Sequence, residues 1–481
     1  MRRATSPRKT MSSSPGCSLT AATSIASKRF ARSAFVVGVS VVVVALIQAF
    51  SGALPLDRMR ISGVDPVEYY VYLPSLFFDK DVNFFNEFFH FAPSRLNVQW
   101  VETATGYRRN PHGIGMAIAQ APFYIAAYLI LAGKSGHFPL PISYKYDPLF
   151  EQAWYIGNIF WFAFATFLMA IWLSRACAVK HALSVSVFFF FATPMLYYTF
   201  PIVPMAHGVS LAAILLLLIC VANFEKTARL RWCLLAGLCL GFVVSVRTTN
   251  FVFLAYLAPH LFLILRSRTQ TAHSRDSQTW RRWLKAPGLA GLGVLLGFLP
   301  QLVVWERVFG SLIVNPYIGE SVFVPANILK VAFSTKHGFI TWHPILLIGL
   351  IGLFVAALKK PRRSVALSGL LGVLCLWVLI STSRNWWGGW SFGHRVFIEA
   401  YPFFALGTGV LVGAALKSKA KSKRLVVLVV AVAAILWNVL FMIQYKAGLI
   451  PREATLTLYQ YLDQKLEILW AIVPGGPALL H

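Results

Sequence analysis

The chain has 481 residues, of which 57% are hydrophobic and only 13% are charged, and its formal net charge is +27. Its apolar runs reach the ~17–25 residues needed to cross a bilayer, which excludes a soluble domain and predicts an all-α polytopic membrane protein. On a soluble protein this charge would suggest nucleic-acid binding. Here the cations gather between apolar runs, so we expect no nucleic-acid partner. The six cysteines show neither zinc nor redox spacing, so we expect neither a disulfide framework nor a cysteine metal cluster.

The N-terminal part divides into three segments. Residues 1–33 are basic, rich in Ser and Thr and without an acid, and we expect a disordered cytoplasmic tail. The apolar run 34–54 exceeds the ~7–15 residues of a signal-peptide core, so it is predicted to be an uncleaved first span. Residues 55–112 then form an outer loop, in which 67–78 and 82–91 mix aromatic and charged residues. That pattern is typical of short helices at the membrane interface.

The remaining apolar runs and their connections predict about 11–12 transmembrane helices in total. The runs are 114–133, 151–173, 183–200, 206–223, 232–246, 249–265, 288–308, 344–358, 365–381, 398–416 and 425–445. The connections rich in Lys and Arg are 174–182, 224–231, 266–287, 359–364 and 417–424. By the positive-inside rule these connections and the N-terminus are cytoplasmic, and we expect a multi-pass protein of the bacterial cytoplasmic (inner) membrane.

One run conflicts with this orientation. If 114–133 crossed the membrane, every later basic connection would lie outside, contrary to the positive-inside rule. We therefore expect this run to lie in the interface or to re-enter, with Gly113, Gly115 and Pro122 permitting a break. About eleven crossings then remain, and the tail 446–481 lies outside. The predicted transmembrane domain spans 34–445, and its outer loops are 55–150, 309–343 and 382–397.

Two carboxylates, Asp65 and Glu68, stand in the first outer loop of a chain that has 17 acidic and 44 basic residues. One interpretation is structural, because Asp at a helix N-cap, Pro66 at the first position and Glu three residues after the cap form a capping box. The other is functional, with one carboxylate acting as a general base toward a lipid-linked substrate.

Three stretches predicted on the outer face carry further polar groups. His112 stands in the turn Asn110-Pro-His-Gly-Ile-Gly115 and either contacts a phosphate or sugar or stabilises the turn. His207 follows two prolines at a helix start and is either a donor or an interface histidine. Arg247 interrupts an apolar run, and because no acid lies nearby in the sequence, anion binding is the favoured interpretation.

The last two stretches are richer in cations and aromatic rings. Residues 334–344 carry Lys336, His337 and His343, which either contact phosphate or are ordinary interface residues. The stretch Arg384-Asn-Trp-Trp-Gly-Gly-Trp-Ser-Phe-Gly-His-Arg395 offers two arginines suited to bidentate phosphate recognition. Its tryptophans form either a sugar-stacking platform or an aromatic belt, and its three glycines favour a shaped loop.

Taken together, these stretches resemble the GT-C superfamily of polytopic membrane glycosyltransferases, in particular bacterial members of the protein-mannosyltransferase and aminoarabinose-transferase type. The resemblance runs from about residue 34 to 445 and rests on six motifs in order along the chain. They are Asp65-Pro-Val-Glu-Tyr-Tyr-Val-Tyr-Leu-Pro, Asn110-Pro-His-Gly-Ile-Gly, Tyr197-Tyr-Thr-Phe with His207, Arg247-Thr-Thr-Asn, His337-Gly-Phe-Ile-Thr-Trp-His-Pro, and Trp386-Trp-Gly-Gly-Trp-Ser-Phe-Gly-His-Arg.

The resemblance implies an inverting transfer of a sugar from a polyprenyl-phosphate donor to a hydroxyl of a lipid, glycan or protein acceptor on the outer face. Asp65 matches the family's catalytic base, and Glu68 is the second candidate catalytic residue. Some members bind a divalent ion through an acidic pair, but Glu68 lies three residues from Asp65, so the resemblance implies no required cofactor and leaves a divalent metal open. The candidate substrate-binding residues are His112, His207, Arg247, Lys336, His337, Arg384, Trp387, His394 and Arg395.

Two other classes of function remain open. The first is a transporter or flippase for a lipid-linked saccharide, although such proteins usually show repeated halves and ionisable groups near mid-membrane. The second is a non-catalytic partner in envelope assembly, with the outer loops as docking surfaces. The sequence indicates neither the sugar nor the acceptor.

Overall fold

The computed structural model describes residues 60–91, 101–199, 204–271, 277–315, 327–359 and 362–472. Within these ranges the chain is helical and contains no β-strand, only an isolated antiparallel bridge between Glu102 and Arg108. The all-α fold predicted from the sequence is therefore confirmed for this part of the chain. The predicted tail 1–33 and first span 34–54 lie outside the described residues.

The helices follow the predicted apolar runs closely. The N-terminal elements are α2 (Val64–Tyr70), α3 (Tyr72–Pro74), η2 (Ser75–Asp79), α4 (Phe85–Phe91), α5 (Gly115–Ser135), η3 (Ile142–Tyr144), α6 (Pro148–Leu173), α7 (Val179–Ala192), α8 (Met195–Thr199) and α9 (His207–Thr227). The middle elements are α10 (Arg231–Val246), η4 (Thr248–Phe253), α11 (Leu254–Thr271) and α12 (Ser277–Phe309). The last are α13 (Asn327–Phe333), α14 (Phe339–Trp342), α15 (Ile345–Ala357), α16 (Arg363–Ser381), η6 (Arg395–Ala400), α17 (Tyr401–Lys417), α18 (Lys421–Lys446), η7 (Tyr459–Asp463) and α19 (Gln464–Ile472).

Seven helices in the described part of the chain are long and apolar enough to cross a membrane, by length and composition. They are α5, α6, α9, the 285–309 part of α12, α16, the continuous η6–α17 and α18. Shorter apolar helices are α7, α10, η4 with the first part of α11, and α15. This set of apolar helices indicates a membrane protein, as the composition predicts.

Closely packed helix pairs form the bundle, and this packing fixes the positions of the helix ends that carry polar residues. A Cβ atom on Gly241 of α10 would lie 2.1 Å from the carbonyl oxygen of Val294 on α12, and one on Gly407 of α17 would lie 1.9 Å from that of Gly349 on α15. Small residues at such crossings let apolar helices approach closely without a hydrophobic driving force between them. This packing fixes the position of Arg247 along the bundle, because Arg247 directly follows α10.

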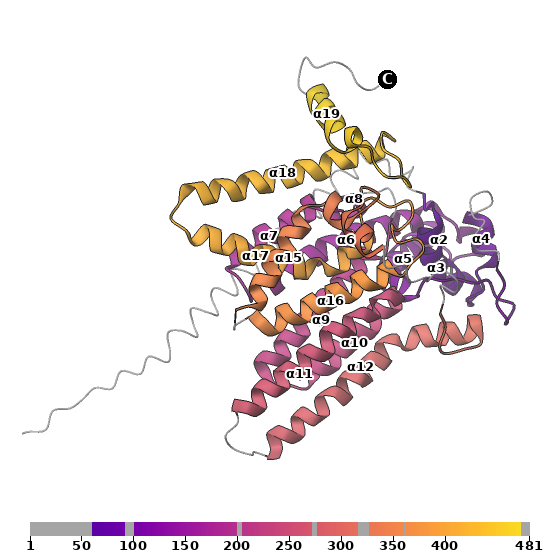
Figure 1. Ribbon diagram of the computed structural model, residues 1–481. Helices are drawn as coiled ribbons and strands as arrows, with labels where there is room; N and C mark the ends of the chain where they lie inside the picture. The colour runs from indigo at the N-terminus through magenta and orange to yellow at the C-terminus, as the bar shows by residue number, and fades with distance from the viewer. Residues whose placement is uncertain are drawn as a thin grey trace, which may run out of the picture.

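The elements α2 to α5 form a second apolar cluster at one end of the bundle, against the first part of α6 (Figure 1). The α5 helix continues through Pro122, so the break that this proline permits is not formed. Segment 60–91 contacts the turn before α5 and the connection that follows it. Before α5, Tyr72 donates to the carbonyl of His112 at 2.7 Å, and beyond its end Lys145 contacts Glu87 at 2.5 Å.

Lys145 anchors this cluster of α2 to α5, which we call the outer unit because the sequence predicts loop 55–150 on the outer face. Its ammonium group is buried and contacts the carboxylates of Asp79 and Glu87. Burial raises the pKa of Glu87 to about 7 even though Lys145 opposes the shift. The carboxylate of Glu87 is fully buried, so the lysine supplies charge that solvent cannot.

These contacts predict the topology of the outer unit. A reporter fused at residue 142 is expected to show the same side of the membrane as one inserted at residue 104, because the turn before α5 and the connection after it both contact segment 60–91. A phosphatase and fluorescent-protein fusion pair would measure this. A cytoplasmic signal at 142 alone would show that α5 crosses.

Lys145→Met is expected to destabilise the protein by roughly 3–5 kcal/mol, because it leaves two carboxylates without their buried counter-charge. Thermal unfolding in detergent measures the loss. Lys134→Met, at an exposed lysine near the end of α5, is the matched control. The same unfolding temperature for both variants would contradict the buried ion cluster.

Candidate functional site

Asp65, Glu68, His112 and Arg395 meet at the junction of the outer unit and the bundle. Arg395 Nη2 donates to Asp65 Oδ2 at 2.6 Å. The Nε2 atom of His112 lies 3.1 Å from Glu68 Oε2 and 3.7 Å from Asp65 Oδ1. Two carboxylates, one imidazole and one guanidinium therefore share a single polar junction between segments more than 300 residues apart.

The local structure explains why the two carboxylates point the same way. Gly63, with φ 94°, is the residue before α2, and Asp65 lies within the first turn rather than at the N-cap. The capping-box interpretation is therefore wrong, because the carboxylate of Asp65 faces Arg395 instead of capping the helix. Glu68 follows three residues later on the same helix face. Asn110 donates to the Glu68 carbonyl at 2.8 Å and holds the His112 turn in place.

The electrostatic setting keeps Asp65 ionised. Burial by itself would raise the pKa of this carboxyl, but the charge of Arg395, the His112 ring and Arg247 outweigh it and hold the pKa well below its usual range. The side chain is still 29% exposed, so a ligand can reach it. Glu68 is 1% exposed and behind it. Asp65 is thus the accessible carboxylate and Glu68 the enclosed one.

A second cluster lies beside the first. Glu399 Oε1 accepts from Arg247 at 3.0 Å and lies 3.0 Å from Nδ1 of His207. Arg247 Nη1 is also 2.7 Å from that nitrogen. His207 begins α9, Arg247 follows α10, and Glu399 belongs to η6 together with Arg395.

The position of Glu399 corrects the prediction made for Arg247. Glu399 is also the main residue of these clusters that the sequence analysis did not select as a candidate site residue. The anion-binding interpretation of Arg247 assumed that no acid neutralises it, but Glu399 does so from 152 positions away along the chain. A signal for it exists in the sequence, since Glu399 is an acid within the apolar run 398–416. Tyr69, which stacks on His112 at 4.2 Å between ring centroids, was likewise not selected.

The other predicted ligand residues have other neighbours. Lys336 covers the ring of Trp387, with Nζ 3.3 Å from the centroid. His337 is fully buried at φ 60° and lies 2.9 Å from the carbonyl of Arg452. His394 is buried and packs edge-on against Phe397. Arg384 is exposed on the loop before Trp387.

The residues Asp65, Glu68 and His112 are also the group best arranged for a metal. Each offers one ligand atom, and these atoms lie within 4.8 Å of one another. Oxygen and imidazole ligands suit several divalent ions. Arg395 pairs with Asp65, and Glu68 contacts His112.

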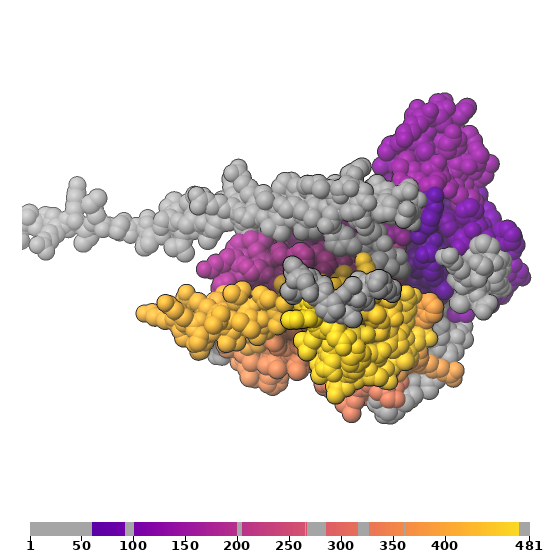
Figure 2. Space-filling model, turned by 90° about the horizontal axis from the view of Figure 1, so that it is seen from above, coloured from indigo at the N-terminus to yellow at the C-terminus, as the bar shows by residue number. Residues whose placement is uncertain are grey.

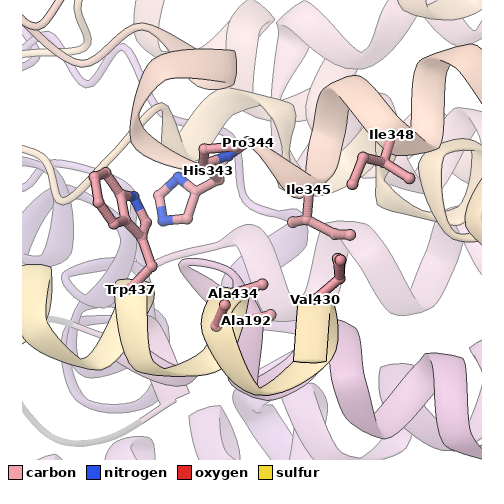
Figure 3. Close-up of a pocket in the computed structure, with 9 residues that line it drawn as sticks. Ala192, His343, Pro344, Ile345, Ile348, Val430, Ala434 and Trp437 are labelled. Atoms are coloured by element: carbon pink, nitrogen blue, oxygen red, sulfur yellow. The ribbon is translucent and has the colours of Figure 1, made fainter. Parts of the chain in front are cut away.

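Two apolar cavities lie along the inner side of α18. One, of about 230 Å³, is lined by His343, Ile345, Val430 and Trp437, with its side chains shown in Figure 3. The other, of about 320 Å³, lies between α7, α15, α17 and α18, and shares Ile345 and Val430 with the first. We call them together the α18 groove. Its His343 end is close to Gly393, where an added Cβ would lie 2.5 Å from the His343 ring.

The comparisons with known proteins give no family assignment. No family model matches the chain, and no curated protein matches its sequence. The site is therefore interpreted from its own residues.

Glu399→Ala is expected to cost roughly 3–5 kcal/mol of stability, because it leaves the buried Arg247 and His207 without their acid. Thermal unfolding of the detergent-solubilised chain measures this. Glu453→Ala removes an exposed acid and is the control. Equal stability of the two variants would show that Glu399 does not neutralise Arg247.

Proposed function

We propose that this protein is an inverting glycosyltransferase that moves a sugar from a polyprenyl-phosphate donor to an acceptor hydroxyl on the outer face of the membrane. The observation that carries the proposal is the partly exposed Asp65 carboxylate held against Arg395, with Arg247 close enough to lower its pKa. A proton acceptor beside fixed cations is what attack on a phosphate-linked sugar requires.

In the proposed reaction, the acceptor oxygen attacks the anomeric carbon of the donor and its proton passes to a carboxylate oxygen of Asp65. The new C–O bond forms as the bond from the anomeric carbon to the phosphate oxygen breaks. The bonding electrons leave on that oxygen as polyprenyl phosphate. Arg395 stabilises the charge that accumulates there, in a setting where burial strengthens the interaction.

The ion pair between Asp65 and Arg395 supports a further step in this mechanism. A carboxylate bound to a guanidinium is a weak base, because the pair stabilises the anion. An anionic donor phosphate competes for Arg395 and weakens its bond to Asp65. The pKa of Asp65 then rises toward that of an ordinary carboxyl, so donor binding itself activates the base.

The donor's hydrocarbon chain also has a place in this proposal. The α18 groove is almost entirely apolar, and its His343 end adjoins Gly393, two residues before Arg395. A prenyl chain in the α18 groove would bring its phosphate toward that end. The groove supports a lipid-linked donor better than a water-soluble nucleotide sugar, which has no long apolar part to bury.

The test is transfer of label by the purified full-length protein from radiolabelled polyprenyl-phosphate hexose to an envelope extract. Asp65→Asn keeps the shape of the side chain but removes the base, and we expect transfer to fall by about 10²–10⁴-fold. Asp463→Asn, at an exposed acid of η7, is the matched control. Unfolding temperatures of both variants separate a loss of chemistry from a loss of fold.

Two outcomes would contradict the proposal. Transfer that is unchanged in Asp65→Asn removes Asp65 from the mechanism. Movement of labelled donor across vesicles without any transfer would instead favour the lipid-linked saccharide transporter.

A further inference from the structure

Three segments far apart in the sequence form one aromatic and cationic surface near the candidate site. They are the loop between α13 and α14, the loop before η6, and the end of α18 with the segment that follows it. Lys336 lies over Trp387, and Arg452 lies over Trp390 and Tyr445, with Cζ 5.3 Å and 5.6 Å from the two ring centroids. We call these five residues the Trp390 surface.

The Trp390 surface is held by contacts that join its three segments. His337, beside Lys336, lies 2.9 Å from the carbonyl of Arg452, and the hydroxyl of Thr335 donates to the carbonyl of Leu456 at 3.2 Å. The His337 ring also stacks on Trp342, with centroids 4.8 Å apart. The backbone under both cations is therefore fixed relative to the bundle.

The loop that carries the two tryptophans is shaped by glycine. Gly388, Gly389 and Gly393 all have positive φ, between 60° and 81°, which other residues rarely adopt. Ser391 donates to the carbonyl of Trp387 at 3.2 Å and closes the turn. The sequence analysis expected a shaped loop rather than a plain aromatic belt, and these backbone angles agree with that expectation.

Exposure and charge distinguish this surface from ordinary packing. Trp390 is 69% exposed although it is a large aromatic residue, and Arg452 is exposed beside it. Among the described residues, neither Lys336 nor Arg452 forms an ion pair, and Glu453 is the acid whose charge acts on Lys336. An exposed indole beside cations that form no ion pair in the described part of the chain favours a ligand that offers both a face to the ring and an anionic group.

We propose that the Trp390 surface binds an anionic saccharide, with a sugar ring against the open face of Trp390 and a carboxylate or phosphate at Arg452 and Lys336. Trp and Arg are the residues that contribute most at recognition sites, and Arg matches planar anions bidentately. Binding itself does not depend on the proposed glycosyl transfer. That this ligand is the sugar acceptor does rest on the proposed function. The same loop leads from Trp390 to Arg395, which contacts Asp65, and so connects the Trp390 surface to the proposed base.

The test is calorimetric titration of the full-length protein in nanodiscs made of neutral lipid. The probes are a trigalacturonate, neutral maltotriose of the same length, glucose 6-phosphate and inorganic phosphate. We expect the trigalacturonate to bind at least about tenfold more tightly than maltotriose, since only the acidic probe meets both cations. Tighter binding of glucose 6-phosphate than of trigalacturonate would assign the anion as phosphate.

Variants locate the binding. Trp390→Ala and Arg452→Gln should each weaken trigalacturonate binding by about tenfold or more, as expected for residues at the centre of a contact. Trp470→Ala, at an equally exposed tryptophan of α19, and Arg229→Gln, at an exposed arginine, are the matched controls. Equal binding of acidic and neutral probes, or no effect of Trp390→Ala, would overturn the proposal. So would binding by inorganic phosphate alone, or a requirement for anionic lipid in the nanodisc.

Asp65→Asn separates this inference from the proposed function. It should leave trigalacturonate binding unchanged, because Asp65 is not part of the Trp390 surface. If binding persists but transfer does not depend on Asp65, the proposed function fails and the Trp390 surface stands. If transfer depends on Asp65 but trigalacturonate does not bind, only the present inference fails.

Discussion

The structure depends on neutralising charged side chains where apolar helices end. An arginine in such a setting is costly unless it meets an acid or water. Arg395 meets Asp65, and Arg247 meets Glu399, so the segment that begins α17 carries one member of each pair. These two ion pairs connect α2 of the outer unit and the end of α10 to the same turn, η6. Any ligand that enters this junction must compete with one of these pairs.

The helix packing is what makes such pairing possible. Glycines let α10 approach α12 and α15 approach α17 closely. This close packing fixes where the helix ends lie relative to one another. The outer unit has its own buried charge cluster around Lys145, which keeps α2 oriented toward the bundle. Two features therefore position the site on the helix bundle. They are small residues where helices cross and acids that pair with cations at the helix ends. Figure 2 shows how the C-terminal segment then packs on the molecule beside α18, leaving α18 itself prominent at the surface.

The length of the apolar runs was enough to predict the long helices of the described residues, because a bilayer requires long stretches of apolar side chains. The polar junction was only partly predictable. Asp65 and His112 belong to turns with a recognisable residue pattern, whereas the partners Arg395 and Glu399 come from the other end of the chain. A single sequence does not encode that proximity in any local pattern. For the same reason the absence of a nearby acid misled the interpretation of Arg247, and the N-cap interpretation of Asp65 failed once Arg395 was its partner.

The remaining polar residues around the junction fall into separate groups according to their contacts. Lys336 and Trp387, both predicted from the sequence as substrate-binding residues, pack against each other, and Arg452 packs over Trp390. His337 and His394 are enclosed by aromatic rings and hold loops in place. The junction itself is thus small, with one accessible carboxylate and two arginines, and it adjoins the α18 groove and the Trp390 surface.

The most direct test of this account is a double-mutant cycle between Asp65→Asn and Arg395→Gln, measured as the free energy of unfolding in detergent. A contact at the junction predicts a coupling energy of roughly 0.5–3 kcal/mol between the two substitutions. Effects that add within about 0.3–0.5 kcal/mol would show that the two side chains do not meet, and would contradict the account.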